Sequence, residues 1–437
     1  MTRLEELGER IDSRRAQIGV MGLGYVGLPL AAAFAGAGYR VTGFELDAEK
    51  VRAIADGRSY IDDVPSAEIG EIVAAGLLAA TSNFAELSAM DVIHVCVPTP
   101  LTKTRDPDFS YIAGAVEEIR KRLRSGQLVI LGSTTYPGTT HERVRPELEA
   151  SGLTAGVDFA LAFAPERIDP GNRDCPVRAV PKVVGGETPR CTDLAVRVFA
   201  PVFDAVIPVS SSQSAEMVKL LENTFRAINI GLANEVALMC NRLGLDVWEV
   251  IDAAATKPYG FMKFLPGPGL GGHCIPVDPT YLSWKLKSLN FSARFIELAT
   301  EINGQMPEHV ALRVAELLNE DRIAVNGSRI LLLGVAYKAD VSDVRESPAL
   351  DVLRRLRERG ADVRYHDPHV SELDLHGEVL KSVELSDAVL EEADLVVVMT
   401  DHSGVDYARV AARAALVFDT RNALRHVDAD REKIRKL

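Results

Sequence analysis

The chain has 437 residues, of which 47% are hydrophobic and 25% charged, and its formal net charge is −13 at pH 7. This length predicts two or three domains, and the composition is ordinary for a soluble globular protein. The acidic balance disfavours nucleic acid and anionic membrane surfaces as partners. No apolar run approaches the roughly 20 residues of a membrane helix, and the charged N-terminal stretch lacks the apolar core of a signal peptide. We therefore expect a cytoplasmic protein.

The cysteines make two further classes of protein unfavourable. Their number is odd and no CxxC pair occurs, which argues against a disulfide framework and against a structural zinc site. We expect no metal ligands among them. The five positions are Cys96, Cys175, Cys191, Cys240 and Cys274.

A nucleotide-binding pattern opens the chain. Residues 17–24 predict an apolar strand, after which Gly22, Gly24 and Gly27 spell GxGxxG at the start of a small-residue helix. The glycines permit a tight turn, close approach to a pyrophosphate and close packing of helix on strand. A second strand ends at Glu45, 18 residues after Gly27. An acid there hydrogen-bonds both ribose hydroxyls and repels a 2′-phosphate, which predicts NAD rather than NADP.

Three more apolar runs end in polar residues. In an open parallel sheet ligands bind at the carboxyl ends of the strands, and the runs at 91–100 and 128–138 place Thr99 and Thr134 there. A threonine alone is more often a turn former. The run at 160–172 ends in a polar loop, where the glutamate and arginine that follow Pro165 could be functional or simply an exposed surface ion pair.

The stretch 214–243 predicts one long helix or two helices in series. An apolar stripe of such length is too long for one domain to cover, which predicts a connector between domains and a dimer interface. Lys219 and Asn223 are four residues apart, off the stripe and on one face, where a solvated surface is the alternative. We expect the stripe to be buried, and its residues are Val218, Leu221, Phe225, Ile228, Leu232, Met239 and Leu243.

Residues 264–282 contain four glycines, four prolines and one cysteine, so we predict a structured loop rather than a helix or strand. The loop presents Cys274, with His273 beside it and Asp278 four residues later. A cysteine so placed is a candidate nucleophile. The alternative is a buried cysteine in a tight turn.

After a linker at 322–327 the plan of the first half recurs without GxGxxG, so this part should bind something other than a second dinucleotide. Its basic residues Lys338, Arg345 and Arg421 fall at strand ends, where a ligand would bind. Strands are expected at 330–334, 363–367, 393–400 and 417–422, and a helix at 347–358. The predicted fold class is α/β, with two doubly wound Rossmann-like domains joined by a long central helix.

Over nearly its whole length the chain resembles the UDP-glucose and GDP-mannose dehydrogenase superfamily. The motifs that carry the resemblance are GLGYVGLP, CVPTP, STTYPGTT, PERIDPGN, KLLENTFRAINI, GPGLGGHCIPVDP, AYKADVSDVRESP and FDTRN. The resemblance implies an NAD-binding Rossmann domain over residues 1–212 and a UDP-sugar-binding domain over 321–437. Between them, residues 213–320 would form a central helical dimerisation region that carries the cysteine loop.

The family oxidises a sugar C6 alcohol to a carboxylate with two NAD⁺ and a covalent cysteine intermediate. By resemblance Cys274 is the nucleophile, Lys219 and Asn223 hold the oxyanion, and Asp278 acts with Lys219 and a water in base chemistry. The resemblance also implies that Glu166 serves thioester hydrolysis and that Thr134 places the water and the nicotinamide. The implied NAD-binding residues are Gly22, Gly24, Tyr25, Val26, Gly27, Glu45, Pro98, Thr99, Thr134 and Arg345. The implied substrate-binding residues are Glu166, Arg167, Lys219, Asn223, Lys257, Phe264, Gly271, Lys338 and Arg421.

The loop residues His273 and Val277, with the run 169–172, resemble the N-acetylhexosamine branch, and most of all the UDP-N-acetylglucosamine 6-dehydrogenases. Two positions depart from the pattern. Gly132 replaces a glutamate common before STTYPG in this branch, and Lys257 stands near the place of an arginine that UDP-glucose members send into the neighbouring subunit.

Several functions stay open at this point. UDP-glucose, UDP-N-acetylmannosamine and UDP-N-acetylgalactosamine are rival substrates. A two-electron dehydrogenase or epimerase without covalent catalysis, and a non-catalytic nucleotide-sugar sensor, are the alternatives of another class. The complete set of candidate catalytic residues argues against a sensor, which has no need to keep them.

Overall fold

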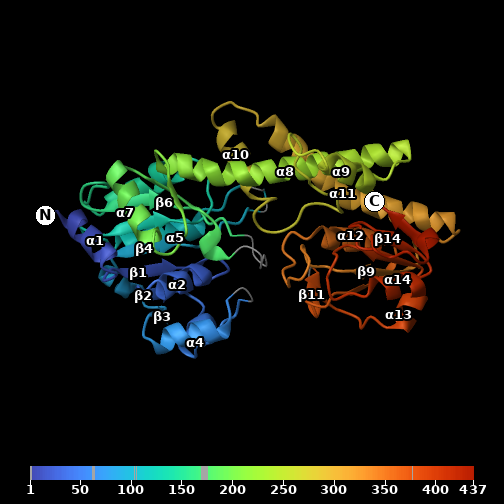
Figure 1. Ribbon diagram of the computed structural model, residues 1–437, viewed down its shortest axis with the longest axis horizontal. Coiled ribbons are helices and arrows are strands. Elements are labelled where there is room, and N and C mark those ends of the chain that lie inside the picture. Colours follow the sequence, from blue (N-terminus) through green and yellow to red (C-terminus); the bar gives the residue numbers. More distant parts are fainter. Residues whose placement is uncertain (1, 62–63, 103, 105, 169–175, 376) are drawn as a thin grey trace. The chain divides into compact units, whose positions relative to one another are not determined.

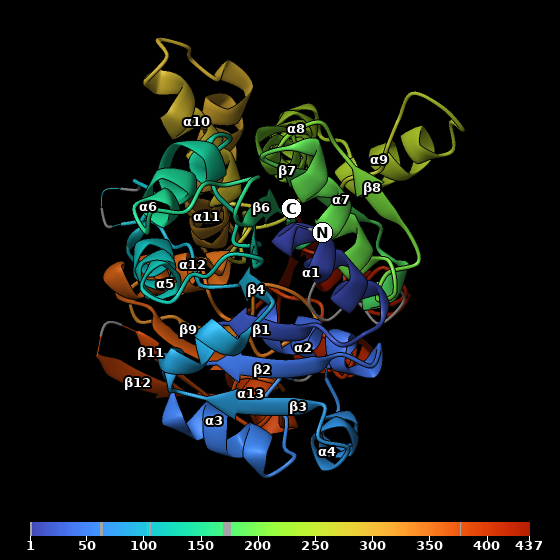
Figure 2. The ribbon, with the colours of Figure 1, turned by 90° about the vertical axis from the view of Figure 1, so that its left-hand side faces the viewer.

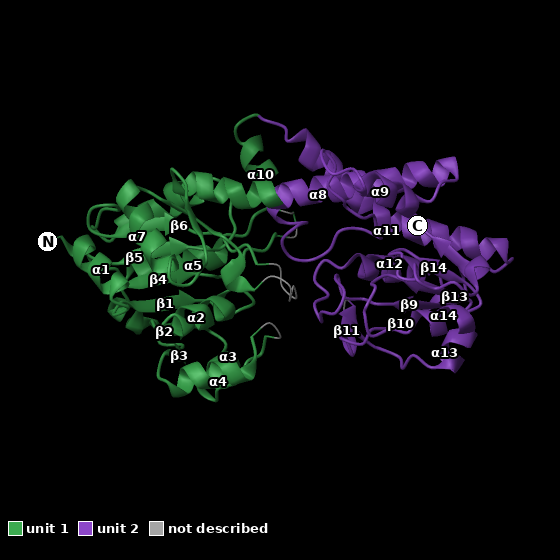
Figure 3. Ribbon diagram, viewed as in Figure 1, with its two compact units in different colours: residues 1–222, 280–290 green, residues 223–279, 291–437 purple. Residues whose placement is uncertain are grey.

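The computed structural model describes residues 2–61, 64–102, 104, 106–168, 176–375 and 377–437. The chain divides into two compact units, shown in Figure 3. Unit 1 comprises residues 1–222 and 280–290, and unit 2 comprises residues 223–279 and 291–437. Two helices, α8 (Ser212–Leu243) and α10 (Asp278–Lys287), run from one unit into the other.

The described residues of unit 1 contain an eight-stranded sheet in the order β3-β2-β1-β4-β5-β6-β7-β8. The first six strands are parallel, β7 is antiparallel to β6, and β8 is parallel to β7. Figure 2 shows β3, β2, β1 and β4 following one another across the sheet. The strands are β1 (Gln17–Met21), β2 (Arg40–Phe44), β3 (Leu78–Thr81), β4 (Val92–Val95), β5 (Leu128–Leu131), β6 (Ala160–Phe163), β7 (Lys182–Gly186) and β8 (Val206–Pro208).

Alternate residues of each central strand bury against opposite helical layers. In β1, Ile18 and Val20 pack with α1, α2 and α7, whereas Met21 packs on the side of α5 and α6. This double burial explains why the strands read as continuous apolar runs. The helices are α1 (Arg3–Asp12), α2 (Gly27–Gly36), α3 (Ala48–Ala55), α4 (Ser66–Ala74), α5 (Ser110–Arg120), α6 (Arg145–Glu149) and α7 (Pro189–Phe199), with shorter turns η1 (Phe84–Ala89), η2 (Thr140–Val144) and η3 (Val177–Ala179).

Unit 2 is built around a sheet of parallel strands, of order β10-β9-β13-β14-β15 among the described residues. Figure 1 labels two of these strands, β9 and β14. Helices α11 and α12 cover one face, and α13 and α14 cover the other. The strands are β9 (Arg329–Leu333), β10 (Asp362–His366), β13 (Leu395–Val398), β14 (Val417–Asp419) and β15 (Ile434–Lys436), beside a hairpin of β11 (Glu372–Leu375) and β12 (Glu378–Lys381). The helices are α9 (Val247–Ala255), α11 (Arg294–Glu320), α12 (Pro348–Glu358), α13 (Asp387–Glu392) and α14 (Tyr407–Arg413), with the short turn η4 (Arg431–Lys433).

Both sheets confirm the predicted α/β class with two Rossmann-like domains and a long helix between them. The predicted boundaries at residues 212 and 320 stay a prediction, because compactness divides the chain inside α8 instead. No helix among the described residues is long and apolar enough to cross a membrane.

Three predictions about local structure were wrong. The loop predicted over 264–282 ends at residue 277, because Asp278 begins α10 with Pro279 in its first turn, where proline is favoured. The stripe on α8 was predicted to be buried, but most of it is exposed in the single chain. The exposed fractions are 58% for Leu221, 45% for Phe225, 55% for Leu232, 49% for Met239 and 70% for Leu243. The solvated face proposed as the alternative for Lys219 and Asn223 is buried, at 7% and 5% exposed.

Candidate active site

The glycine turn of unit 1 contains three glycines, and the surroundings of each are different. Gly22 has φ +85°, and a Cβ there would lie 2.7 Å from the carbonyl oxygen of Cys96. A Cβ on Gly27 would lie 1.8 Å from the carbonyl oxygen of Gly22, so only glycine lets α2 begin so close to β1. A Cβ on Gly24 would meet no atom within 4 Å. That open space at the N-terminus of α2 is the cradle a pyrophosphate needs.

Glu45 follows β2 directly and faces this turn. Its Oε2 accepts the backbone N–H of Leu23 at 3.0 Å, and its Oε1 accepts those of Leu46 and Asp47 at 2.9 and 3.2 Å. Lys50 Nζ lies 3.9 Å from Oε2. The carboxylate is therefore fixed beside the cradle, where a ribose would lie if a dinucleotide binds, and these residues fit NAD.

The predicted threonines lie after neighbouring strands, as parallel topology requires. Thr99 follows β4 and is 6% exposed, and Thr134 follows β5 and is partly buried. The Ser133 hydroxyl donates to the carbonyl of Val97 at 2.7 Å and ties the two loops together. Of the other residues in unit 1 that were predicted to bind NAD, Tyr25 and Pro98 are exposed and Val26 is partly buried.

Glu166 does not form the surface ion pair with Arg167 that was considered as its alternative role. Its Oε2 lies 3.0 Å from Lys182 Nζ, and the two side chains are 10% and 2% exposed. Arg167 instead pairs with Glu222 on α8. Burial alone would raise the pKa of Glu166, but the Lys182 ammonium and two backbone N–H bonds outweigh burial and lower it. Residues 169–172, which supported the substrate prediction, lie outside the described residues.

Lys219 is buried on the part of α8 that belongs to unit 1, three residues after Glu216. The carboxylate of Glu216 accepts the backbone N–H groups of Gly138 and Thr140 and the hydroxyl of Thr140, at 2.5, 2.8 and 2.7 Å. Burial raises the pKa of Glu216 to about 7. Glu216 thus fastens the turn that follows Thr134 to the helix that carries Lys219, a role that the sequence did not reveal.

In unit 2 Cys274 is an exposed residue. The alternative of a buried cysteine in a tight turn is therefore wrong. The cysteine's carbonyl accepts the N–H groups of Val277 and Asp278 at 3.2 and 2.8 Å, so the nucleophile candidate lies directly before α10. The Asn223 side-chain amide donates to the Asp278 carboxylate, and both groups are buried. By contrast, the other described cysteines are buried: Cys96, Cys191 and Cys240.

The cysteine loop packs on the loop that follows β9. A Cβ on Gly271 would lie 2.8 Å from the Cβ of Tyr337 and 2.9 Å from the carbonyl of Glu346. The N–H of Gly272 donates to the carbonyl of Arg345 at 3.1 Å, and the Arg345 side chain pairs with Asp343. The loop is therefore fixed by close backbone contacts. It lies next to two of the predicted basic residues, because Lys338 follows Tyr337 in the chain.

Three other residues of unit 2 were predicted to bind the substrate: Arg421, Phe264 and Lys257. Arg421 follows β14 and donates to the carbonyl of Met399 at 2.9 Å, while its guanidinium fills the space beside Gly267 of the cysteine loop. The ring of Phe264 lies 5.8 Å from that of Phe225, edge to face. Lys257 lies elsewhere, with its Nζ 5.0 Å from the centre of the Tyr259 ring.

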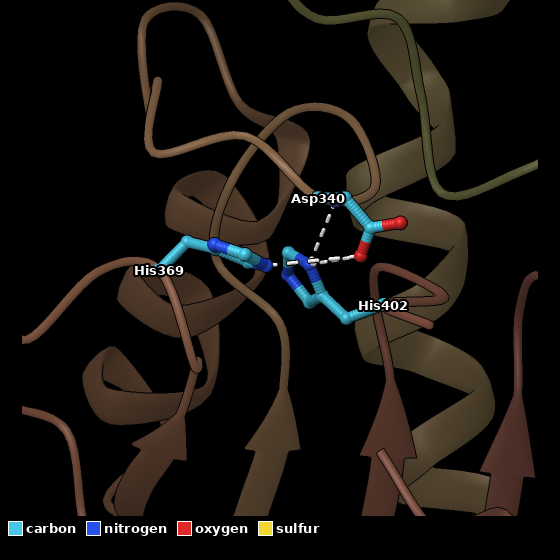
Figure 4. A group of neighbouring side chains, drawn as sticks. All are labelled: Asp340, His369 and His402. Atoms are coloured by element: carbon cyan, nitrogen blue, oxygen red, sulfur yellow. Dashed lines mark hydrogen bonds and ion pairs between the residues drawn. The ribbon is translucent and has the colours of Figure 1, made fainter. Parts of the chain in front are cut away.

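A further cluster of His369, His402 and Asp340 lies in unit 2 (Figure 4). Its ligand atoms are within 4.8 Å of one another, a spacing that could suit a metal. However, both nitrogens of the buried His402 are already engaged. Nδ1 accepts the backbone N–H of Asp340 and Nε2 faces Asp367 Oδ2, each at 3.0 Å. We therefore conclude that His402 holds the loop that carries Lys338 in place and does not act as a metal ligand.

Sequence profiles of one family match three consecutive parts of the chain: its NAD binding domain over residues 16–203, its central domain over 213–305 and its UDP binding domain over 331–426. The chain belongs to the UDP-glucose/GDP-mannose dehydrogenase family. The family resemblance and the NAD cofactor predicted from the sequence are thereby confirmed, and the protein is an NAD-dependent oxidoreductase of the UDP-sugar dehydrogenase class.

Relatives in this family differ in the sugar that their names specify. The UDP-N-acetyl-D-mannosamine dehydrogenase of Pyrococcus horikoshii is 35% identical over 94% of this chain and 96% of its own. The UDP-N-acetyl-D-glucosamine 6-dehydrogenase of Pseudomonas aeruginosa is 38% identical over 81% of this chain and 83% of its own. The solved structure of the Pyrococcus horikoshii enzyme matches with a TM-score of 0.87 and covers 96% of this chain and 98% of that one, at 34% identity.

Proposed function

We propose that this enzyme oxidises the C6 alcohol of a UDP-N-acetylhexosamine to the carboxylate in a four-electron reaction through a thioester on Cys274. The observation that carries the proposal is the exposed residue Cys274, held just before α10 in the unit that also contains the buried Asn223–Asp278 pair. A two-electron dehydrogenase needs no such thiol.

The chemistry divides into two oxidations and a hydrolysis. The first oxidation removes a hydride from C6 and a proton from its hydroxyl, leaving an aldehyde. The Cys274 thiolate forms a C–S bond to the aldehyde carbon, and the oxygen takes a proton to give a thiohemiacetal. The second oxidation removes a hydride and the hydroxyl proton, leaving a thioester. Water then adds to the carbonyl carbon, the C–S bond breaks, and carboxylate, thiolate and two protons result.

We assign the remaining roles to side chains whose environments suit them. Lys219 and Asn223 lie one turn apart on α8 and are buried, so each offers a fixed donor for an oxyanion. Asp278, which accepts from Asn223, serves as a base in the first oxidation with Lys219 and a water. Glu166 accepts a proton from the hydrolytic water, and Thr134 orients that water.

The glycine turn and Glu45 would hold the dinucleotide, with Tyr25, Val26, Pro98 and Thr99 around it, and the family resemblance adds Arg345 as a further proposed NAD contact. NAD⁺ held by these residues would supply the hydride acceptor for each oxidation, so two molecules would be used per sugar. The UDP-sugar would be held by Lys338 and Arg421, with the loop from Phe264 to Gly271 around it and Arg167 and Lys257 as further contacts.

UDP-N-acetylglucosamine is the substrate we favour. His273 and Val277 in the cysteine loop and the 38% identity to the Pseudomonas aeruginosa enzyme support this choice. The relatives named for UDP-N-acetylmannosamine make that sugar the nearest rival. UDP-N-acetylgalactosamine and UDP-glucose are the others.

A panel of these four UDP-sugars with NAD⁺ tests both parts of the proposal. We expect two NADH per sugar consumed and the highest kcat/KM for UDP-N-acetylglucosamine. One NADH per sugar would contradict the four-electron reaction. A kcat/KM for UDP-glucose equal to or above that for every N-acetylhexosamine would contradict the substrate class.

We also propose that the enzyme is a homodimer that covers the exposed apolar stripe of α8. Side chains such as Leu221 and Leu243 are 58% and 70% exposed in one chain, and the helix is 32 residues long. Burying such a stripe in a symmetric contact is the ordinary way to remove it from water. Light scattering at micromolar concentration should give at least twice the 47.4 kDa of the chain, and a monomer mass would contradict the proposal.

A further inference from the structure

Lys182, at the start of β7, is an unusual lysine because its charged end is inside the protein. The side chain is 2% exposed, and its Nζ lies 5.3 Å and 5.2 Å from the ring centres of Phe199 and Phe203. A lysine ammonium is costly to bury without a partner of opposite charge. Its partner is Glu166, whose Oε2 lies 3.0 Å away.

The carboxylate of Glu166 is held from two sides. Lys182 donates to Oε2, and the backbone N–H groups of Arg167 and Ile168 donate to Oε1 at 2.7 and 3.0 Å. Arg167 does not compete for the carboxylate with its guanidinium, because that group pairs with Glu222 and donates to the carbonyl of Pro181. Among the described residues, the side-chain cation that contacts Glu166 is Lys182, so the orientation of Glu166 depends on it.

Among the described residues, two other titratable groups interact electrostatically with Lys182, and both are neutral at pH 7. Burial, and then the charge of Lys182, hold the pKa of His94 well below its usual value, and burial raises the pKa of Cys96 to about 12. His94 Nδ1 lies 3.0 Å from Cys96 Sγ, so these two groups bond to each other. Glu166 is therefore the anion among the groups that face Lys182.

This arrangement also explains why residue 132 is a glycine. A Cβ on Gly132 would lie 2.3 Å from Cε1 of His94, so the imidazole already fills the space that a side chain at 132 would need. A glutamate there would have to displace His94. Because residue 132 is a glycine and His94 is neutral, the Lys182 ammonium pairs with Glu166.

We propose that Lys182 is a positioning residue for the hydrolysis step: it fixes Glu166 as an oriented carboxylate, ready to accept a proton from the water that attacks the thioester. This inference rests on the role given to Glu166 under the proposed function. Lys182 itself need touch neither substrate nor cofactor. Its effect should therefore appear only through Glu166, and only after both oxidations.

The test is a double-mutant cycle with Lys182→Met and Glu166→Gln, each measured for the pre-steady-state burst of NADH and for steady-state turnover. Without its cation the buried Glu166 should ionise only at higher pH. We expect Lys182→Met to keep a burst of about two NADH per site, to lose at least about tenfold in kcat at pH 7, and to shift the acid limb of the kcat profile upward by at least about one pH unit.

In the Glu166→Gln background, Lys182→Met should change turnover by less than about twofold, because the group it positions is gone. Lys182→Arg, which keeps the charge, should restore the acid limb. Lys121→Met is the matched control, since this exposed lysine also pairs with glutamates, Glu117 and Glu118. It should behave as wild type.

Three outcomes would overturn the inference: a wild-type pH profile for Lys182→Met, loss of its burst, or an additive loss in the Glu166→Gln background. The last two would mean that Lys182 supports the fold in general. If Glu166→Gln itself turned over like wild type, the proposed role of Glu166 would fail. If Glu166→Gln stalled and Lys182→Met did not, only the role of Lys182 would fail.

Discussion

The two sheets begin in the same way, but the acidic residue after the second strand has a different role in each. In each, a glycine follows the first strand and an acid follows the second: Gly22 and Glu45 in unit 1, Gly334 and Asp367 in unit 2. Both glycines have positive φ, +85° and +84°. Glu45 has a side chain 13% exposed beside the open space at Gly24, whereas the side chain of Asp367 is fully buried.

The carboxylate of Asp367 accepts its hydrogen bonds from donors inside the protein. Burial alone would raise its pKa, but the bonds it accepts, first among them that from His402, outweigh burial and lower the pKa to about 2. The donors are the backbone N–H groups of Val335, Ala336, His369 and Val370 and the side chain of His402. The same topology therefore builds a nucleotide cradle in unit 1 and an internal clamp in unit 2.

Among the variants that distinguish the two units, we expect the largest loss of activity when Cys274 in unit 2 is replaced. Cys274→Ser keeps the size of the side chain but exchanges a thiolate for a poor nucleophile. Production of the uronic acid should fall by several orders of magnitude, while calorimetry shows that the UDP-sugar still binds. Near wild-type acid production would remove covalent catalysis from the account.

The cradle in unit 1 can be filled without disturbing the fold. Because a Cβ on Gly24 would meet no protein atom within 4 Å, Gly24→Val should leave the thermal midpoint unchanged but raise the KM for NAD⁺ by about a hundredfold or more. Gly36→Val is the control, since its Cβ position is also open but lies at the far end of α2. An unchanged KM for NAD⁺ would place the pyrophosphate elsewhere.

Glu45 should act on cofactor choice. Its carboxylate would face a 2′-phosphate, so kcat/KM for NAD⁺ should exceed that for NADP⁺ by at least about tenfold. Glu45→Gln should narrow this ratio, because the negative charge is lost while the shape is kept. Equal values for the two cofactors in the wild type would mean that Glu45 does not contact the ribose.

Asp367 should act on stability instead. Its folded pKa of about 2 lies below the ordinary value of 3.8, so its contribution is complete above pH 3.8 and is lost as the pH falls toward 2. Asp367→Asn should lower the free energy of unfolding at pH 7 by at least about 2 kcal/mol in urea melts. Asp351→Asn, at an exposed ion pair on α12, is the control and should cost less than about 0.5 kcal/mol. Equal losses in the two variants would contradict the clamp.

The sequence was sufficient for features set by local spacing. The glycine turn, the placement of Thr99 and Thr134 after β4 and β5, and the long helical stretch of α8 follow from short-range patterns. The exposure of Cys274 did not, because the sequence left a buried cysteine open as the alternative. Proline at position 279 could also have indicated that α10 starts at Asp278, since proline is favoured in the first turn of a helix.

Features that depend on contacts between residues far apart in the sequence could not be predicted from the sequence. Glu166 and Lys182 meet because β7 turns back antiparallel to β6, and no periodicity in the sequence reports that turn. The five donors on Asp367 come from three separate segments, so its role could not be distinguished from that of Glu45 by position alone.

The thioester itself is the central claim, and intact mass spectrometry of Glu166→Gln tests it most directly. With UDP-N-acetylglucosamine and NAD⁺ this variant should release about two NADH per site in a fast burst and then stall. The stalled protein should be heavier by the acyl-sugar nucleotide, and Glu166→Gln combined with Cys274→Ser should not. An unmodified Glu166→Gln protein with a slow first turnover would contradict the account, because Glu166 would then act before the thioester forms.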